Sequence, residues 1–94
     1  MKIHPTEVSD WTLEELAQSV AGMRYDRVVY FLECFEEEIS RQSESDKKIN
    51  RDKLCLLLTR AKTQIGILIS IFQDMVDGPC KKYIEVEKEQ RGEE

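Results

Sequence analysis

Apolar residues recur along most of the chain at intervals of three and four, the spacing that places side chains on one side of an α-helix. Three successive segments have this pattern. A glycine separates the first two, a polar stretch separates the second from the third, and a Gly-Pro pair ends the third. Only 4 glycines and 2 prolines are available to interrupt 94 residues, which indicates long elements. The sequence therefore predicts an all-α protein with one domain.

The first segment opens with a capping box. The hydroxyl of Thr12 accepts a hydrogen bond from a backbone amide of the first turn, while Glu15 reaches back to the amide of Thr12. The apolar repeat then stops at Gly22, a residue that commonly follows a helix. These signals predict a short helix over residues 12–21.

The second segment starts at Arg24 and has a regular apolar seam of the kind that packs along another helix. The seam consists of Tyr25, Val28, Leu32, Phe35 and Ile39. Residues 40–48 contain no apolar side chain, and Ser43, Ser45 and Asp46 favour a bend. We therefore expect the buried seam to end at Ile39 and the chain to turn back near residue 47.

The third segment has the most regular repeat, with the coiled-coil spacing of four and three kept throughout. Its seam consists of Leu54, Leu58, Ala61, Ile65, Leu68, Phe72 and Met75. Asn50 is a candidate cap and Gly78-Pro79 a stop. Such a helix is about 40 Å long, and its short link to the second helix predicts a long antiparallel helical hairpin. The expected charge pairs across the hairpin are Glu33 with Lys62, Glu37 with Arg60, and Glu44 with Arg51.

The domain boundaries follow from composition. Residues 1–10 have no periodic pattern and predict a flexible arm, residues 11–84 form the helical domain, and residues 85–94 predict a charged, disordered tail. Around Tyr83 and Ile84 a final short helix is possible before that tail begins.

The third helix is apolar on more than its seam, so a single hairpin leaves part of it uncovered. We expect a homodimer in which two hairpins form a helical bundle. The expected interface consists of Leu57, Ile65, Ile67, Leu68, Ile69, Ile71, Phe72, Met75 and Val76. A second interaction face is expected at Tyr30, Phe31 and Cys34.

The chemistry in the sequence argues against an enzyme. His4 is the only histidine, the 3 cysteines have no CxxC spacing, and no phosphate-binding loop is present. We expect no catalytic residue, metal or cofactor. The longest apolar run, Ile65–Phe72, is much shorter than the roughly 20 residues of a membrane span. The sequence predicts a cytoplasmic protein with reduced thiols and no membrane partner.

Two functions remain open. The first is a non-enzymatic protein–protein interaction or regulatory module that self-associates through its third helix and binds a further, unidentified protein. The second is a DNA-binding regulator, because residues 12–32 resemble a degenerate helix-turn-helix with Gly22 at the turn. Its candidate nucleic-acid contacts are Arg24, Tyr25, Arg27, Lys47, Lys48 and Arg51. The net charge of −5 speaks against nucleic acid as the partner without excluding it.

Overall fold

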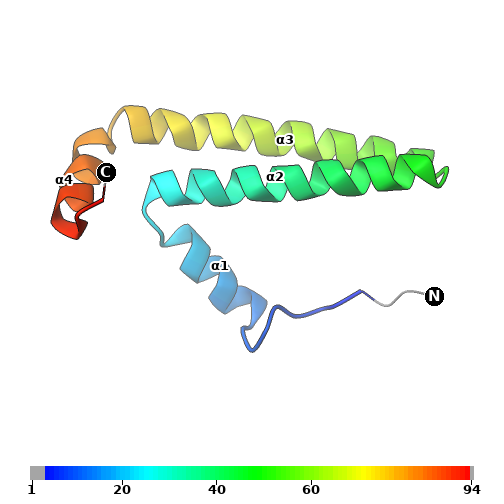
Figure 1. Cartoon of the computed structure of the whole chain (residues 1–94), viewed down its shortest axis with the longest axis horizontal. Coiled ribbons are helices and arrows are strands. Elements are labelled where there is room, and N and C mark those ends of the chain that lie inside the picture. The colour runs from blue at the N-terminus through cyan, green and yellow to red at the C-terminus, as the bar shows by residue number, and fades with distance from the viewer. Residues whose placement is uncertain (1–3, 94) are drawn as a thin grey trace.

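The computed structural model describes residues 4–93 and is built from helices (Figure 1). The helices are α1 (Leu13–Ala21), α2 (Tyr25–Lys48), α3 (Asp52–Asp77) and α4 (Lys81–Arg91). The part of the chain that the structure describes has no strand beyond an isolated bridge between Val8 and Trp11. The prediction of an all-α fold is confirmed.

The start of α1 is fixed by the capping box. The Thr12 hydroxyl accepts from the Glu15 amide at 3.0 Å, and the Thr12 amide donates to the Glu15 carboxylate at 3.1 Å. The amide of Thr12 lowers the pKa of the Glu15 carboxyl because it stabilises the charged form. Gly22 follows the helix, as expected from the sequence.

Helix α2 differs from the prediction because it runs through residues 40–48 without a bend. Ser43, in the middle of this stretch, is buried against α3 and donates to the Cys55 carbonyl at 3.2 Å. Its hydroxyl also lies 3.2 Å from that of Thr59. The apolar pattern could not predict this extension, since polar side chains make the contact.

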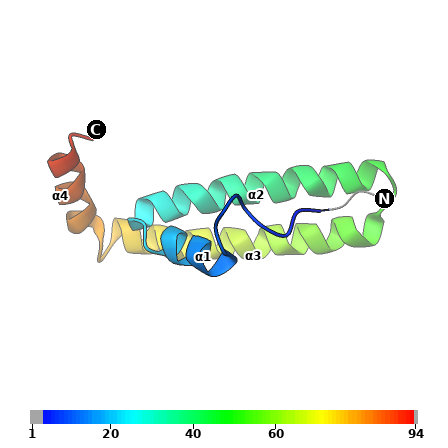
Figure 2. The ribbon, with the colours of Figure 1, turned by 90° about the horizontal axis from the view of Figure 1, so that it is seen from below.

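Helices α2 and α3 lie side by side and run antiparallel, as two views of the ribbon show (Figures 1 and 2). The chain reverses over residues 49–51, with Asn50 in the left-handed region at a φ of 61° and no side-chain cap on α3. Because this turn lies beyond residue 47, the two helices are displaced by about two turns from the expected register. Lys62 consequently donates to Ser40 at 3.2 Å. None of the three expected charge pairs forms among the described residues.

The segment expected to fray from residue 85 is largely helical, because α4 extends to Arg91. Ile84 in α4 has the smallest exposed fraction among the described residues, at 4%. Gly92 then ends the helix in the left-handed region that glycine favours. The C-terminal segment is therefore a packed element that lies near the start of α2 (Figure 1).

The chain is extended and its core is small. Of the described residues, only Val28, Val29, Ser43 and Ile84 are buried. The radius of gyration is 16.6 Å, against about 12 Å for a compact domain of this length. The accessible surface is 7874 Å², against about 5,600 Å² for a compact monomer of the same mass. Roughly 2,300 Å² of surface per chain is thus in excess of what such a monomer exposes.

Candidate interaction face

Polar and small side chains form the part of the contact line between α2 and α3 that is nearer the turn, whereas buried Val29 and half-buried Ile69 and Val76 lie along the rest of it. In the part nearer the turn, Ser40 and Ser43 meet Lys62, Cys55 and Thr59. Further along, a Cβ added at Gly66 would lie 3.2 Å from the Glu36 carboxylate, so the glycine permits close approach of the helices. The two apolar seams therefore do not face each other.

Both seams instead lie on the same lateral side of the hairpin. Successive residues of an α-helix are rotated by about 100° about the helix axis. On this basis the seam of α3 points about a quarter of a circle away from Lys62 and Gly66, which face α2. An equivalent turn separates the seam of α2 from Ser40 and Ser43. Together the seams make one surface, called here the apolar face. Its members are Tyr25, Val28, Phe31, Leu32, Phe35, Ile39, Leu54, Leu57, Leu58, Ala61, Ile65, Leu68, Phe72 and Met75.

Contacts within the apolar face confirm that both helices contribute to it. The rings of Tyr25 and Phe72, from α2 and α3, have centroids 5.7 Å apart. Phe31 stacks on Phe35 at 6.3 Å. Even so, Phe35 is 47% exposed and Leu68 41% exposed, which is unusual for large apolar side chains in the middle of such a surface.

Helix α1 covers only one end of this face. It leads away from the start of α2 and lies in front of the hairpin when seen from below (Figures 1 and 2). Between α1 and the hairpin is an open groove of about 580 Å³, called here the α1 groove. Its lining is Leu13, Leu16, Ala17, Val20 and Ala21 from α1, with Tyr25, Val28, Phe31, Leu32, Leu68, Phe72 and Met75 from the hairpin.

The structure divides the expected interface residues into three groups. Leu57, Ile65, Leu68, Phe72 and Met75 belong to the apolar face. Ile69 and Val76 are half-buried at positions turned toward α2. Ile67 and Ile71 are about half exposed and lie outside the apolar face, with Ile67 on the same side of α3 as Arg60 and Thr63.

The three residues of the expected second face, all exposed on α2, differ in their surroundings. Phe31 lines the α1 groove. Tyr30 instead packs beneath the Arg27 guanidinium, which lies 5.1 Å from the ring centroid. Cys34 is exposed on the same helix and forms no disulfide.

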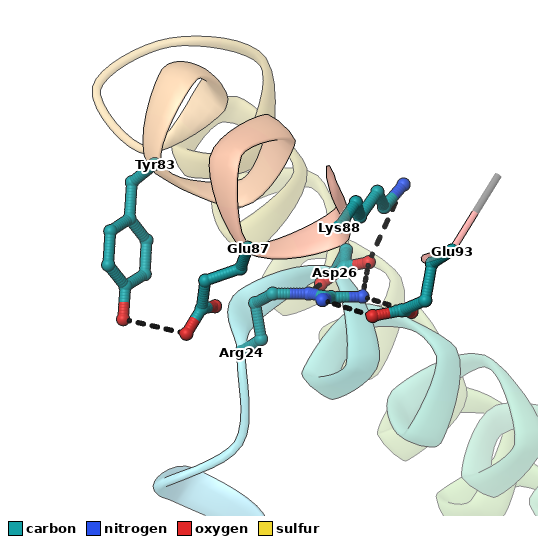
Figure 3. A network of polar contacts seen from close by, with 6 residues as sticks. All are labelled: Arg24, Asp26, Tyr83, Glu87, Lys88 and Glu93. Carbon is teal, nitrogen blue, oxygen red and sulfur yellow. Dashed lines mark hydrogen bonds and ion pairs between the residues drawn. The ribbon is translucent and has the colours of Figure 1, made fainter. Parts of the chain in front are cut away.

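A polar cluster joins α4 to the start of α2 (Figure 3). The Arg24 guanidinium donates to Asp26 at 2.6 Å and to Glu93 at 2.8 Å, so one side chain ties together segments 69 residues apart. Lys88 lies 3.8 Å from Asp26. Hydrogen bonds from Arg24 lower the pKa of both carboxyls, and the same bonds raise the pKa of Arg24. This Arg24 clasp borders a cavity of about 810 Å³.

The clasp bears on the nucleic-acid hypothesis. The six candidate nucleic-acid contacts do not form one basic surface, because Arg24 is neutralised by two carboxylates and Tyr25 packs on Phe72. Arg51 lies 3.7 Å from Asp46 at the other end of the hairpin. Lys47 and Lys48 are also at that end, about 35 Å along α2 from Arg24.

Sequence reasoning missed two features that matter here. The α1 wall of the groove had a signal, because Leu13, Leu16, Ala17 and Val20 share one side of a helix. The partnership of Arg24 with Glu93 had none, because no local pattern relates residues at opposite ends of a chain.

Two properties of the described residues bear on membrane insertion and on metal binding. Helix α3 is long and apolar enough to cross a membrane by length and composition, with a mean hydropathy of 1.5 over its most apolar 18 residues. Over residues 4–93, no group of three or more His, Cys, Asp or Glu is arranged to hold a metal ion. Comparison with known protein families, characterised proteins and solved structures finds no match.

Proposed function

We propose that this protein is a small, non-enzymatic helical interaction module of the cytoplasm that self-associates through α3 as a homodimer. The observation that carries the proposal is the apolar face, in which large side chains from both seams stay well exposed, from 38% for Tyr25 to 47% for Phe35. A contiguous apolar surface of this extent on a soluble protein is typical of an interface.

The surface area supports association. The excess of roughly 2,300 Å² per chain over a compact monomer is larger than the roughly 800 Å² per partner of a standard interface. It is close to what obligate dimers bury, and obligate interfaces resemble an apolar core divided in two. The coiled-coil spacing of the α3 seam suits packing against another long helix.

The charge distribution on α3 favours this role over membrane insertion. Arg60 and Lys62 lie inside the helix, and the longest stretch without a charge is Thr63–Gln73, 11 residues. That stretch is about 16 Å long, roughly half of the 30 Å hydrocarbon core of a bilayer. Placing two cations near the bilayer centre costs about 2.5 to 3.5 kcal/mol each on insertion scales.

The test is the molar mass measured by light scattering on a sizing column over a hundredfold range of concentration. A dimer is expected for the unchanged chain. Leu68→Asp should shift it to the monomer, because burying a carboxylate in the interface costs several kcal/mol. Thr63→Asp is the matched control, since Thr63 is exposed on the same helix away from the apolar face. An unchanged chain that is monomeric at every concentration would refute the proposal.

A further inference from the structure

We propose that the α1 groove is completed by the second copy of this chain, which inserts the tip end of its α3 in an antiparallel, reciprocal arrangement. This inference rests on the proposed homodimer and adds its geometry. The tip end is the part of α3 next to the α2–α3 turn, and its apolar residues are Leu54, Leu57, Leu58 and Ala61. In a two-fold arrangement each copy both supplies a tip and receives one.

The first argument is what each half of the apolar face lacks. At the α1 end, the face has a groove with three helical walls and an open side. At the tip end, α3 continues apolar through Leu54 and Leu57, which are 43% and 48% exposed, while no α1 covers them. The tip of α3 from one copy can fill the α1 groove of the other copy, and the reverse, when the two copies run in opposite directions.

The seam of α3 is compatible with this direction. Its spacing of four and three is nearly symmetric about residue 65, so an antiparallel copy meets it in register. That register places Ala61 against Leu68 of the other copy, and Leu58 against Phe72. The small Ala61 thus meets the larger Leu68, and Ile65 lies near the two-fold axis.

Charge complementarity is an independent argument. Residues 47–62, at the tip end, have six bases and one acid, whereas the described arm and α1, residues 4–21, have four acids and no lysine or arginine. In the described arm and α1, Glu7, Asp10, Glu14 and Glu15 are all exposed. An antiparallel pair brings each basic tip against the acidic α1 region of the other copy, while a parallel pair brings like charges together.

The experiment is thiol cross-linking between two differently labelled copies. Cys34, Cys55 and Cys80 are first replaced by serine, and light scattering establishes that this background is dimeric. One copy then has Ala17→Cys in the α1 groove and the other has Ala61→Cys at the tip. The two are unfolded together, refolded and treated with a short bis-maleimide.

The expected result is a mixed product linking position 17 of one copy to position 61 of the other. The Ala17→Cys protein alone should not cross-link, and Thr63→Cys, exposed on the opposite side of α3, should not replace Ala61→Cys. A dimer that cross-links through position 17 alone, or forms no mixed product, overturns the antiparallel arrangement and leaves the homodimer standing. A monomer by light scattering overturns both.

Discussion

Two adjacent leucines in α3 allow a direct measurement of what the apolar face contributes to association. Leu57 belongs to the apolar face and is 48% exposed in the single chain. Leu56 is 60% exposed but points to the side of α3 that carries Arg60 and Thr63. Leu57→Ala should weaken the dimer, while Leu56→Ala should leave it unchanged.

The magnitude follows from the exposed fraction of Leu57. Leu→Ala removes three methylene equivalents, about 2.4 kcal/mol for a side chain that passes fully from water into an interior. About half of Leu57 remains to be buried, which gives about 1.2 kcal/mol per copy. A two-fold interface contains the residue twice, so the loss is about 2.4 kcal/mol per dimer, or a dissociation constant about 50-fold higher.

The assay is sedimentation equilibrium on both variants, with helix content followed by circular dichroism. Alanine is a good helix former, so neither change should reduce helix content in α3. Equal dissociation constants for the two variants would show that association does not use the apolar face. A larger effect for Leu56→Ala would place the interface on the opposite side of α3.

Four further predictions concern the fold and its electrostatics. Ile84→Ala should lower the free energy of unfolding in urea by about 2 to 5 kcal/mol, and the half-exposed Val86→Ala by only about 1 kcal/mol; equal losses would show that α4 is not docked. Arg24 lowers the pKa values of Asp26 and Glu93 from their ordinary 3.8 and 4.5, so their stabilising contribution is complete above pH 4.5 and lost on acidification below that range. The NMR methyl signal of Ile84 should therefore move toward its unfolded position in acid, and a signal that stays fixed throughout the acid titration would contradict this. Thr12→Ala should destabilise α1 by about 1 kcal/mol in amide exchange while Thr12→Ser does not, and equal exchange in both would show that the cap is not needed. Finally, added salt should raise the dimer dissociation constant, because the proposed antiparallel pairing places basic tips against acidic regions; salt independence would argue against that pairing.

The sequence predicted the parts of the fold that depend on local signals. The capping box at Thr12, the stop at Gly22 and the all-helical class each follow from neighbouring residues. The extension of α2 to Lys48 did not, because a polar stretch gives no apolar period. There, Ser43 packs by hydrogen bonding to Cys55, a contact that the pattern of apolar residues does not encode.

The partner of each apolar seam could not be predicted from the sequence. A regular seam shows that one side of a helix will be covered, but it does not identify what covers it. The sequence interpretation expected each seam to pack along another helix and assigned part of the α3 seam to a dimer interface, and in the structure Ser40, Ser43 and Lys62 make contacts between α2 and α3 beside the seams. Several expected interface residues, including Leu68 and Phe72, lie on the apolar face, because α3 has more apolar residues than α2 alone covers.

The polar contact line between α2 and α3 has a consequence for how this chain stays folded. Serine hydroxyls and a lysine contribute little net free energy beyond replacing their bonds to water, and Val28 and Val29 are the only buried apolar residues described in the hairpin, so the hairpin of one copy alone is weakly stabilised. If the apolar face is buried by a second copy, most of the folding free energy comes from that encounter. The melting temperature then rises with protein concentration by mass action. Folding and partner recognition become a single bimolecular equilibrium, and the cell sets the folded fraction by how much of the chain it makes.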